Sequence, residues 1–168
     1  MKLKYLLLSL ILLLVSISSY SQEPKKIGLS GSLQDNQFGI LIPIWMGEKF
    51  VLAPAFDLKI AEKAGTDFAI ALVPRFYFSK EKLSPYFGLK FGTFINKPYT
   101  ENDVDPDTKL DILGGLAFGG EYFLSEHFSF GVEVQANLTK SDDNSYRFGN
   151  PGKINFNTGT MIAATVYF

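Results

Sequence analysis

From residue 26 to the end of the chain, apolar and polar residues alternate with a period of two. In the stretch FSFGVEVQANL at 128–138, every even-numbered position is apolar, and the odd-numbered positions hold Ser, Gly, Glu, Gln and Asn. Successive side chains of a β-strand point to opposite faces, so this pattern predicts a strand with one apolar and one polar face. Beyond the first 21 residues we find no helical periodicity. The sequence therefore predicts an all-β protein.

Eight segments show this alternation and predict eight strands. Most of them reach the roughly 9–11 residues that a tilted strand needs to cross a bilayer, and they exceed the usual globular strand of about 5–6 residues. Because prolines interrupt a hydrogen-bonded ladder, we expect Pro43, Pro54 and Pro74 to lie at bulges near one rim. The predicted strands are Lys26–Gln34, Gln37–Met46, Phe50–Ala61, Asp67–Ser79, Ser84–Asn96, Thr108–Leu124, Phe128–Lys140 and Lys153–Phe168.

The connections between these segments alternate in length. Tight turns are predicted at 47–49, 80–83 and 125–127, whereas the links Lys97–Asp107 and Ser141–Gly152 are long and polar. Short turns at one end and longer loops at the other are typical of transmembrane barrels. The first outer link, Asp35-Asn36, is short and departs from this contrast. An even number of strands places both chain ends at the short-turn side.

The bulk of the side chains indicates which face is inside. The apolar faces carry Phe, Ile and Leu, whereas the opposite faces carry small residues such as Gly88, Gly115 and Ala117. The interior of an eight-stranded barrel is only just wide enough for side chains to fill, so the large apolar residues must point outward. We therefore predict an eight-stranded antiparallel up-and-down transmembrane β-barrel whose apolar face contacts lipid.

Four charged residues fall on the inward face of four adjacent strands: Arg75, Lys90, Glu121 and Glu133. Each lies a few residues from a short turn, so we predict that they form one balanced network at similar depth. Burying a charge is costly unless it is paired. A structural plug is the favoured interpretation, because so small a barrel leaves little room for an aqueous channel. A charged constriction or proton path is the alternative.

The first 21 residues have the layout of a signal peptide. Lys2 and Lys4 precede an apolar run from Tyr5 to Val15, and small polar residues follow. We predict a signal peptide at 1–21 and a single barrel domain at 22–168. A membrane-anchoring helix is the alternative, although the apolar run is shorter than the roughly 20 residues of a spanning helix. The sequence contains no cysteine, so a lipoprotein anchor, disulfides and thiolate metal sites are not expected.

Little in the sequence indicates catalysis. The net charge of −1 argues against a nucleic-acid partner. The single histidine, His127, lies in a turn with Ser125 and Glu126, where polar turn residues are the simpler interpretation than a catalytic group. The stretch at 114–121 is rich in glycine but lacks the helix that follows a phosphate-binding loop, and the acidic stretch at 101–107 does not match a calcium loop. We expect a non-enzymatic protein without a cofactor or metal.

The leader, the eight amphipathic strands, the tight turn within YFLSEHFSFGVEV and the terminal Phe168 together resemble the small outer-membrane β-barrel family of the OmpA transmembrane domain and OmpX. The resemblance covers residues 26–168. It implies location in the cell outer membrane, with lipid as a partner and a structural, adhesive or host-interaction role. It also implies that Tyr167 and Phe168 act as an assembly signal for the barrel-assembly machinery. No peptidoglycan-binding domain is expected after Phe168.

Within this resemblance, the outer loops 97–107 and 141–152 are the expected contacts for an extracellular ligand. Two alternatives remain open. One is a narrow, porin-like pore for small solutes. The other is a soluble secreted barrel that binds a ligand inside, which would reverse the assignment of the two faces.

Overall fold

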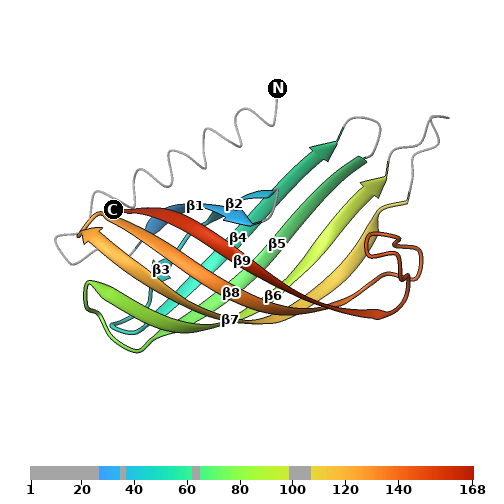
Figure 1. Ribbon diagram of the computed structural model, residues 1–168. Coiled ribbons are helices and arrows are strands. Elements are labelled where there is room, and N and C mark those ends of the chain that lie inside the picture. Colours follow the sequence, from blue (N-terminus) through green and yellow to red (C-terminus); the bar gives the residue numbers. More distant parts are fainter. Residues whose placement is uncertain (1–26, 35–36, 62–64, 99–106) are drawn as a thin grey trace, which may run out of the picture.

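The computed structural model describes residues 27–34, 37–61, 65–98 and 107–168, and for residues 37, 59–61, 65 and 98 it describes the backbone alone. The predicted signal peptide and most of the loop 97–107 lie outside these ranges. No helix in the described ranges is long and apolar enough to cross a membrane. The described chain is a single antiparallel sheet that curls into a barrel (Figure 1).

The sheet closes on itself with eight strand positions around the barrel. Its order is β2-β1-β9-β8-β7-β6-β5-β4-β3, and the additional pairing of β2 with β4 closes the ring. β2 and β3 follow one another along a single line and together form the second strand of the barrel. The predicted fold class is therefore confirmed. The strands are β1 (Gly28–Gln34), β2 (Gln37–Leu41), β3 (Ile44–Trp45), β4 (Phe50–Ala61), β5 (Gly65–Tyr77), β6 (Leu83–Pro98), β7 (Lys109–Ser125), β8 (Phe128–Lys140) and β9 (Ile154–Tyr167).

The three prolines do not lie at bulges, so that expectation is wrong. The pairing of β4 with its neighbours keeps one register on both sides of Ile42–Pro43, and the β5–β6 ladder loses only the pairs at Val73 and Pro74 before it resumes unshifted. The Pro54 carbonyl accepts a hydrogen bond from the Ile42 N–H (2.9 Å), but a proline has no N–H to return one. Each proline therefore costs a local ladder bond without shifting the register.

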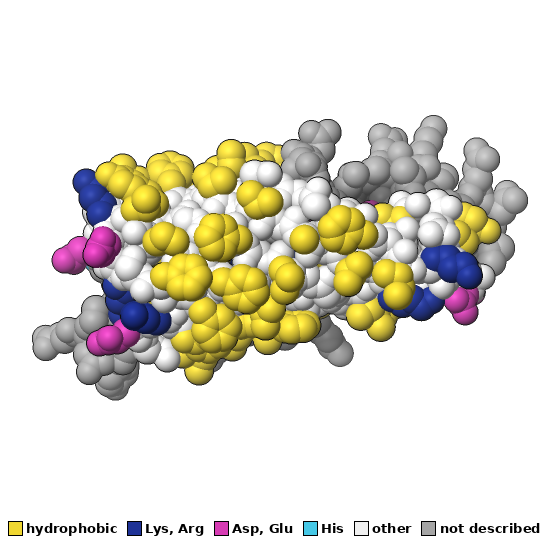
Figure 2. Space-filling view, turned by 60° about the horizontal axis from the view of Figure 1, so that its bottom comes forward, with side chains coloured by type: hydrophobic (Ala, Val, Ile, Leu, Met, Phe, Trp, Pro, Cys, Tyr) yellow, Lys and Arg dark blue, Asp and Glu magenta, His cyan; other side chains and the backbone are white. Residues whose placement is uncertain are grey.

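The two faces of the barrel differ as predicted. Large apolar side chains cover the outer surface over most of its length, and charged side chains gather at the two ends (Figure 2). The buried side chains include many polar ones, such as Glu133, Gln135 and Asn137. Glycines on the inward face make room for larger neighbours: a Cβ on Gly119 would lie only 2.7 Å from the Tyr86 ring. The core of this protein is thus a polar lumen inside an apolar shell.

Candidate functional site in the barrel lumen

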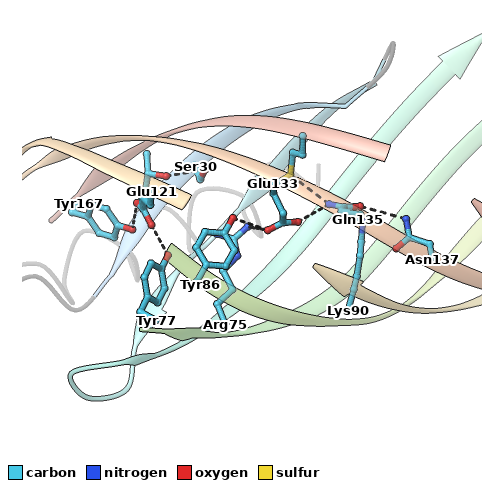
Figure 3. A network of polar contacts seen from close by, with 12 residues as sticks. Ser30, Arg75, Tyr77, Tyr86, Lys90, Glu121, Glu133, Gln135, Asn137 and Tyr167 are labelled. Atoms are coloured by element: carbon cyan, nitrogen blue, oxygen red, sulfur yellow. Dashed lines mark hydrogen bonds and ion pairs between the residues drawn. The ribbon is translucent and has the colours of Figure 1, made fainter. Parts of the chain in front are cut away.

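Polar side chains fill the lumen in successive layers along the barrel axis. Figure 3 shows Glu121 with two tyrosines at one end of the group, Glu133 with Arg75 and Tyr86 in the middle, and Gln135 with Lys90 and Asn137 beyond them. The layers arise because β6, β7 and β8 keep one register over residues 84–96, 112–123 and 129–140, which sets inward-facing residues of neighbouring strands side by side. The register between β7 and β8 shifts only between Phe123 and Ser125, next to the short turn.

The lowest layer is built around the Glu121 carboxylate. It accepts hydrogen bonds from the hydroxyls of Tyr77 and Ser129, and from that of Tyr167 at 2.7 Å. Glu121 lies on β7 and its three donors lie on β5, β8 and β9, so this carboxylate links four strands. No ion pair to Glu121 occurs among the described residues. Hydroxyl donors, rather than a cation, therefore compensate this buried charge.

The middle layer contains a buried ion pair. The guanidinium of Arg75 lies 2.9 Å from the Glu133 carboxylate, and the exposed fractions of the two side chains are 7 % and 1 %. The same carboxylate accepts hydrogen bonds from the Tyr86 hydroxyl (2.8 Å) and the Gln135 amide (2.7 Å). Arg75 also lies over the Tyr86 ring, 4.8 Å from its centroid. A buried ion pair tolerates its loss of solvation only with additional hydrogen bonds. The Glu133 carboxylate has them, whereas Arg75 Nε is buried without a hydrogen-bond partner among the described residues.

Lys90 belongs to a third layer and forms no ion pair with a carboxylate among the described residues. Its ammonium donates to the Gln135 side-chain oxygen at 3.1 Å. Hydrogen bonds connect three of the four predicted charges, because Gln135 bonds both to Lys90 and to Glu133, the partner of Arg75. Glu121 bonds instead to hydroxyls in the layer below. The structure places Arg75, Lys90, Glu121 and Glu133 in the lumen, but it pairs only Arg75 with Glu133 and separates the other two by layer.

The sequence analysis missed the neutral members of these layers. Tyr77, Tyr86 and Gln135 complete the contacts of the two glutamates, and all of them lie on the inward face of the alternation. The prediction considered only charged residues on the inward face and therefore did not include these three neutral side chains. A search for every hydrogen-bonding side chain on the inward positions would have found them, because an enclosed carboxylate needs donors of any kind.

A cavity of about 220 Å³ begins at the third layer, above Glu133. Lys90, Asp57 and Asn137 line its wall, and Arg147 and Phe148 from the loop 141–152 line its outer end. Arg147 reaches across the lumen to Asp67 on β5 (3.0 Å) and stacks over the Phe94 ring of β6, 4.2 Å from its centroid. The loop therefore crosses the outer mouth of the barrel.

Asp111 holds the same loop at its root. Its carboxylate accepts a hydrogen bond from the Asp142 backbone N–H (2.8 Å) and another from the Ser145 hydroxyl (3.0 Å). Asp111 and Ser145 are both buried, although Ser145 lies in a loop. The loop 141–152 is thus a packed part of the structure.

The remaining sequence candidates form no catalytic arrangement in the described residues. The backbone N–H of His127 donates a hydrogen bond to the Ser125 hydroxyl (3.2 Å). Its ring nitrogen Nδ1 lies 3.2 Å from the Tyr167 carbonyl oxygen. The imidazole thus contacts the backbone of the closing strand rather than a nucleophile. Across the described residues no cluster of three or more metal-ligating side chains occurs. The acidic stretch 101–106 lies outside them.

Comparison with known proteins identifies the fold. Neisserial surface protein A is similar over 84 % of this chain and 93 % of its own, with a TM-score of 0.57 and 12 % identity. The N-terminal β-barrel domain of Pseudomonas aeruginosa OprF is similar over 84 % and 95 %, with a TM-score of 0.56 and 11 % identity. Ail of Yersinia pestis aligns with a TM-score of 0.43 and 12 % identity.

A scan against protein-family models and a search of curated proteins found no match. The resemblance to the small outer-membrane barrels is therefore confirmed at the level of the fold, and identities this low show the fold alone.

Proposed function

We propose that this chain is an integral protein of a Gram-negative outer membrane, with a closed lumen and a non-enzymatic, structural or surface-interaction role. The observation that carries the proposal is the pair of layers around Glu121 and Glu133. Side chains from five strands fill the cross-section there, and they leave the carboxylates fully bonded. A conducting pore needs an open, hydrated path at every depth, which these layers interrupt.

The outer surface supports the membrane location. Phe118, Val132 and Val134 are each more than half exposed although they are apolar, and similar residues continue around the barrel. Monomeric soluble proteins rarely expose continuous apolar patches larger than a few hundred Å². Lipid is the solvent that such a surface fits, and this argues against the soluble ligand-binding barrel.

The packed loop 141–152 supports a surface role, because an anchored loop presents a fixed shape to a ligand. We assign the extracellular contact to this loop together with 97–107. One protein of similar fold is, by its name, a surface protein of Neisseria. For biogenesis we assign Phe168 as the contact for the barrel-assembly machinery. Its side chain is 57 % exposed, and Tyr167 beside it is held inward by Glu121.

Conductance in planar bilayers tests the closed lumen. We expect purified, refolded protein to show no stable open steps above leak, and the Glu133→Ala and Glu121→Ala variants to introduce them if the two layers form the barrier. Stable steps from the unmodified protein would overturn the closed lumen in favour of the narrow pore. Membrane fractionation gives the location, and recovery in the soluble periplasmic fraction would overturn it.

A further inference from the structure

The barrel wall has an opening in its side above the β1–β2 hairpin. β1 pairs with residues 161–167 of β9, and residues 154–160 of β9 pair with β8 alone. On the other side of the hairpin, residues 58–61 of β4 pair with β5 alone. Among the described residues, no strand joins these two edges. Figure 1 shows β4 and β9 diverging beyond the short hairpin.

The lumen cavity meets this opening. Its lining includes Gln34 and Leu41 from the hairpin, Asp57 from β4, and Asn157 from β9, which are the three sides of the opening. The Glu133 layer closes the cavity below, and Arg147 and Phe148 cross it at the outer mouth. The residues on the three sides of the opening therefore also form part of the cavity wall.

The opening begins at the depth of the apolar band. β1 contains 7 residues. At about 3.3 Å per residue and a tilt of about 40°, it rises roughly 18 Å, whereas the apolar band of such barrels is about 25 Å tall. Unpaired backbone groups are not tolerated against hydrocarbon. The free edges of β4 and β9 therefore need a polar partner at this depth.

The cavity and its rim have opposite chemical character. Inside, Lys90 and Asp57 carry opposite charges, and no ion pair joins them to each other in the part of the chain that the structure describes. Outside, the rim carries Phe38, Leu58 and Phe156, all strongly exposed, with 77 % of Phe38 accessible. This combination fits an amphiphile with a zwitterionic head and apolar tails.

We propose that the side opening binds the headgroup of a zwitterionic membrane phospholipid. The phosphate lies near Lys90 and the ammonium near Asp57, while the acyl chains lie on the apolar rim. The headgroup supplies polar partners for the free strand edges, and the chains remain in the membrane. This inference rests on the membrane location proposed above.

Binding of lysophosphatidylethanolamine to the refolded barrel in non-ionic detergent, measured by isothermal titration calorimetry, tests the proposal. We expect saturable binding at one site, weakened about tenfold in Lys90→Met and in Asp57→Asn, because each change removes one charged partner of the headgroup. Asn157→Trp places a bulky side chain at the exposed edge of β9, away from the layers below, and is expected to weaken binding to a similar degree. Lys109→Met, a cation of β7 outside the cavity lining, leaves binding within about twofold.

Heat-dependent migration on gels shows that each variant is folded before it is titrated. Equal binding by all four variants means unspecific contact with the barrel surface and overturns the proposal. Phosphoethanolamine has the same headgroup but no acyl chain. If it binds as tightly as lysophosphatidylethanolamine, the ligand is a soluble solute, and the lipid proposal is overturned. Tighter binding of lysophosphatidylglycerol overturns the zwitterionic assignment.

The titration tests the lipid site and the fractionation tests the membrane location, so either proposal can be overturned without the other. Membrane-integrated protein with variant-independent binding removes the lipid site and leaves the location standing. Variant-dependent binding by a protein that fractionates as soluble supports the site and removes the location.

Discussion

The last two residues, Tyr167 and Phe168, point to opposite faces of the barrel wall. The Tyr167 backbone N–H donates to the His127 carbonyl (2.8 Å), and its hydroxyl donates to Glu121 in the lumen. The neighbouring Phe168 points to the outside. The pair at the end of the chain therefore combines an inward hydrogen bond with an aromatic side chain exposed on the outer face.

Tyr167→Phe removes one hydroxyl donor from the buried Glu121 carboxylate without changing the ring. We expect the free energy of unfolding to fall by about 1–3 kcal/mol, because a buried charged acceptor then loses a partner. Urea titration of the barrel folded into lipid vesicles measures the change. Tyr146→Phe, at an exposed loop tyrosine, is the matched control and is expected to have no effect beyond about 0.5 kcal/mol. Equal effects of the two changes would show that the Glu121 contact contributes nothing.

Glu133→Leu leaves the Arg75 guanidinium buried without its carboxylate. We expect a loss of about 3–5 kcal/mol, the typical cost of removing one partner of a buried ion pair. The double variant Arg75→Met with Glu133→Leu recovers about half of this loss or more, because it buries no unpaired charge. Glu48→Leu, in an exposed turn, controls for the loss of a surface carboxylate. A double variant as unstable as the single one contradicts this account of the layer.

At the scale of elements, the alternation of apolar and polar residues predicts the strands to within two residues at every described boundary except in the second strand. That strand divides at Ile42–Pro43, where Pro43 faces β1 and the opposing Pro54 cannot donate across to Ile42. The pattern of side chains does not record this break, because the chain stays extended and the register is preserved. Backbone donors, rather than hydrophobicity, decide where a ladder is interrupted.

The lumen contacts were predicted less well, for a related reason. Alternation tells which residues face inward, but depth depends on the stagger between strands, and a one-residue slip reverses every face. Glu121 and Glu133 are inward on adjacent strands, yet the register pairs Glu133 with Gly119 and Glu121 with Gly131. The two carboxylates therefore lie in different layers, and each meets different donors.

Two sets of side-chain contacts hold the outer loop 141–152: those of the Asp111 carboxylate and those of Arg147. Asp111→Ala removes the acceptor for the Asp142 N–H and the Ser145 hydroxyl, and we expect the loop to become open to proteolysis between 141 and 152 while the barrel stays folded. Limited trypsin digestion of folded protein, which reads cleavage after Arg147, measures this. Asp107→Ala is the control, since Asp107 is exposed at the same end of the barrel. Unchanged cleavage after Arg147 in Asp111→Ala would mean that the Arg147 contacts alone hold the loop.

At the scale of the whole molecule, the lumen is divided along its axis. The Glu121 and Glu133 layers lie toward the short-turn end, and the cavity lined by Lys90 and Asp57 lies above them. The half that these two layers fill thus contains the tight turns and Phe168, and the half with the side opening contains the long loops. The layers that close the lumen and the opening that gives access to the cavity therefore lie at different depths of the barrel.

The outward face provides the test of the whole architecture, because lipid and water respond oppositely to a charge placed on it. Leu116 and Leu124 both point outward from β7 and are both 53 % exposed, but Leu116 lies mid-strand and Leu124 lies next to the 126–127 turn. In a membrane-spanning barrel, we expect Leu116→Lys to cost about 2–4 kcal/mol of unfolding free energy and Leu124→Lys about 0–1 kcal/mol. In a water-soluble barrel, the two changes would have equal and small effects. Urea titrations of both variants in lipid vesicles separate the two cases, and equal costs would exclude the membrane band that the pattern of the strands predicts.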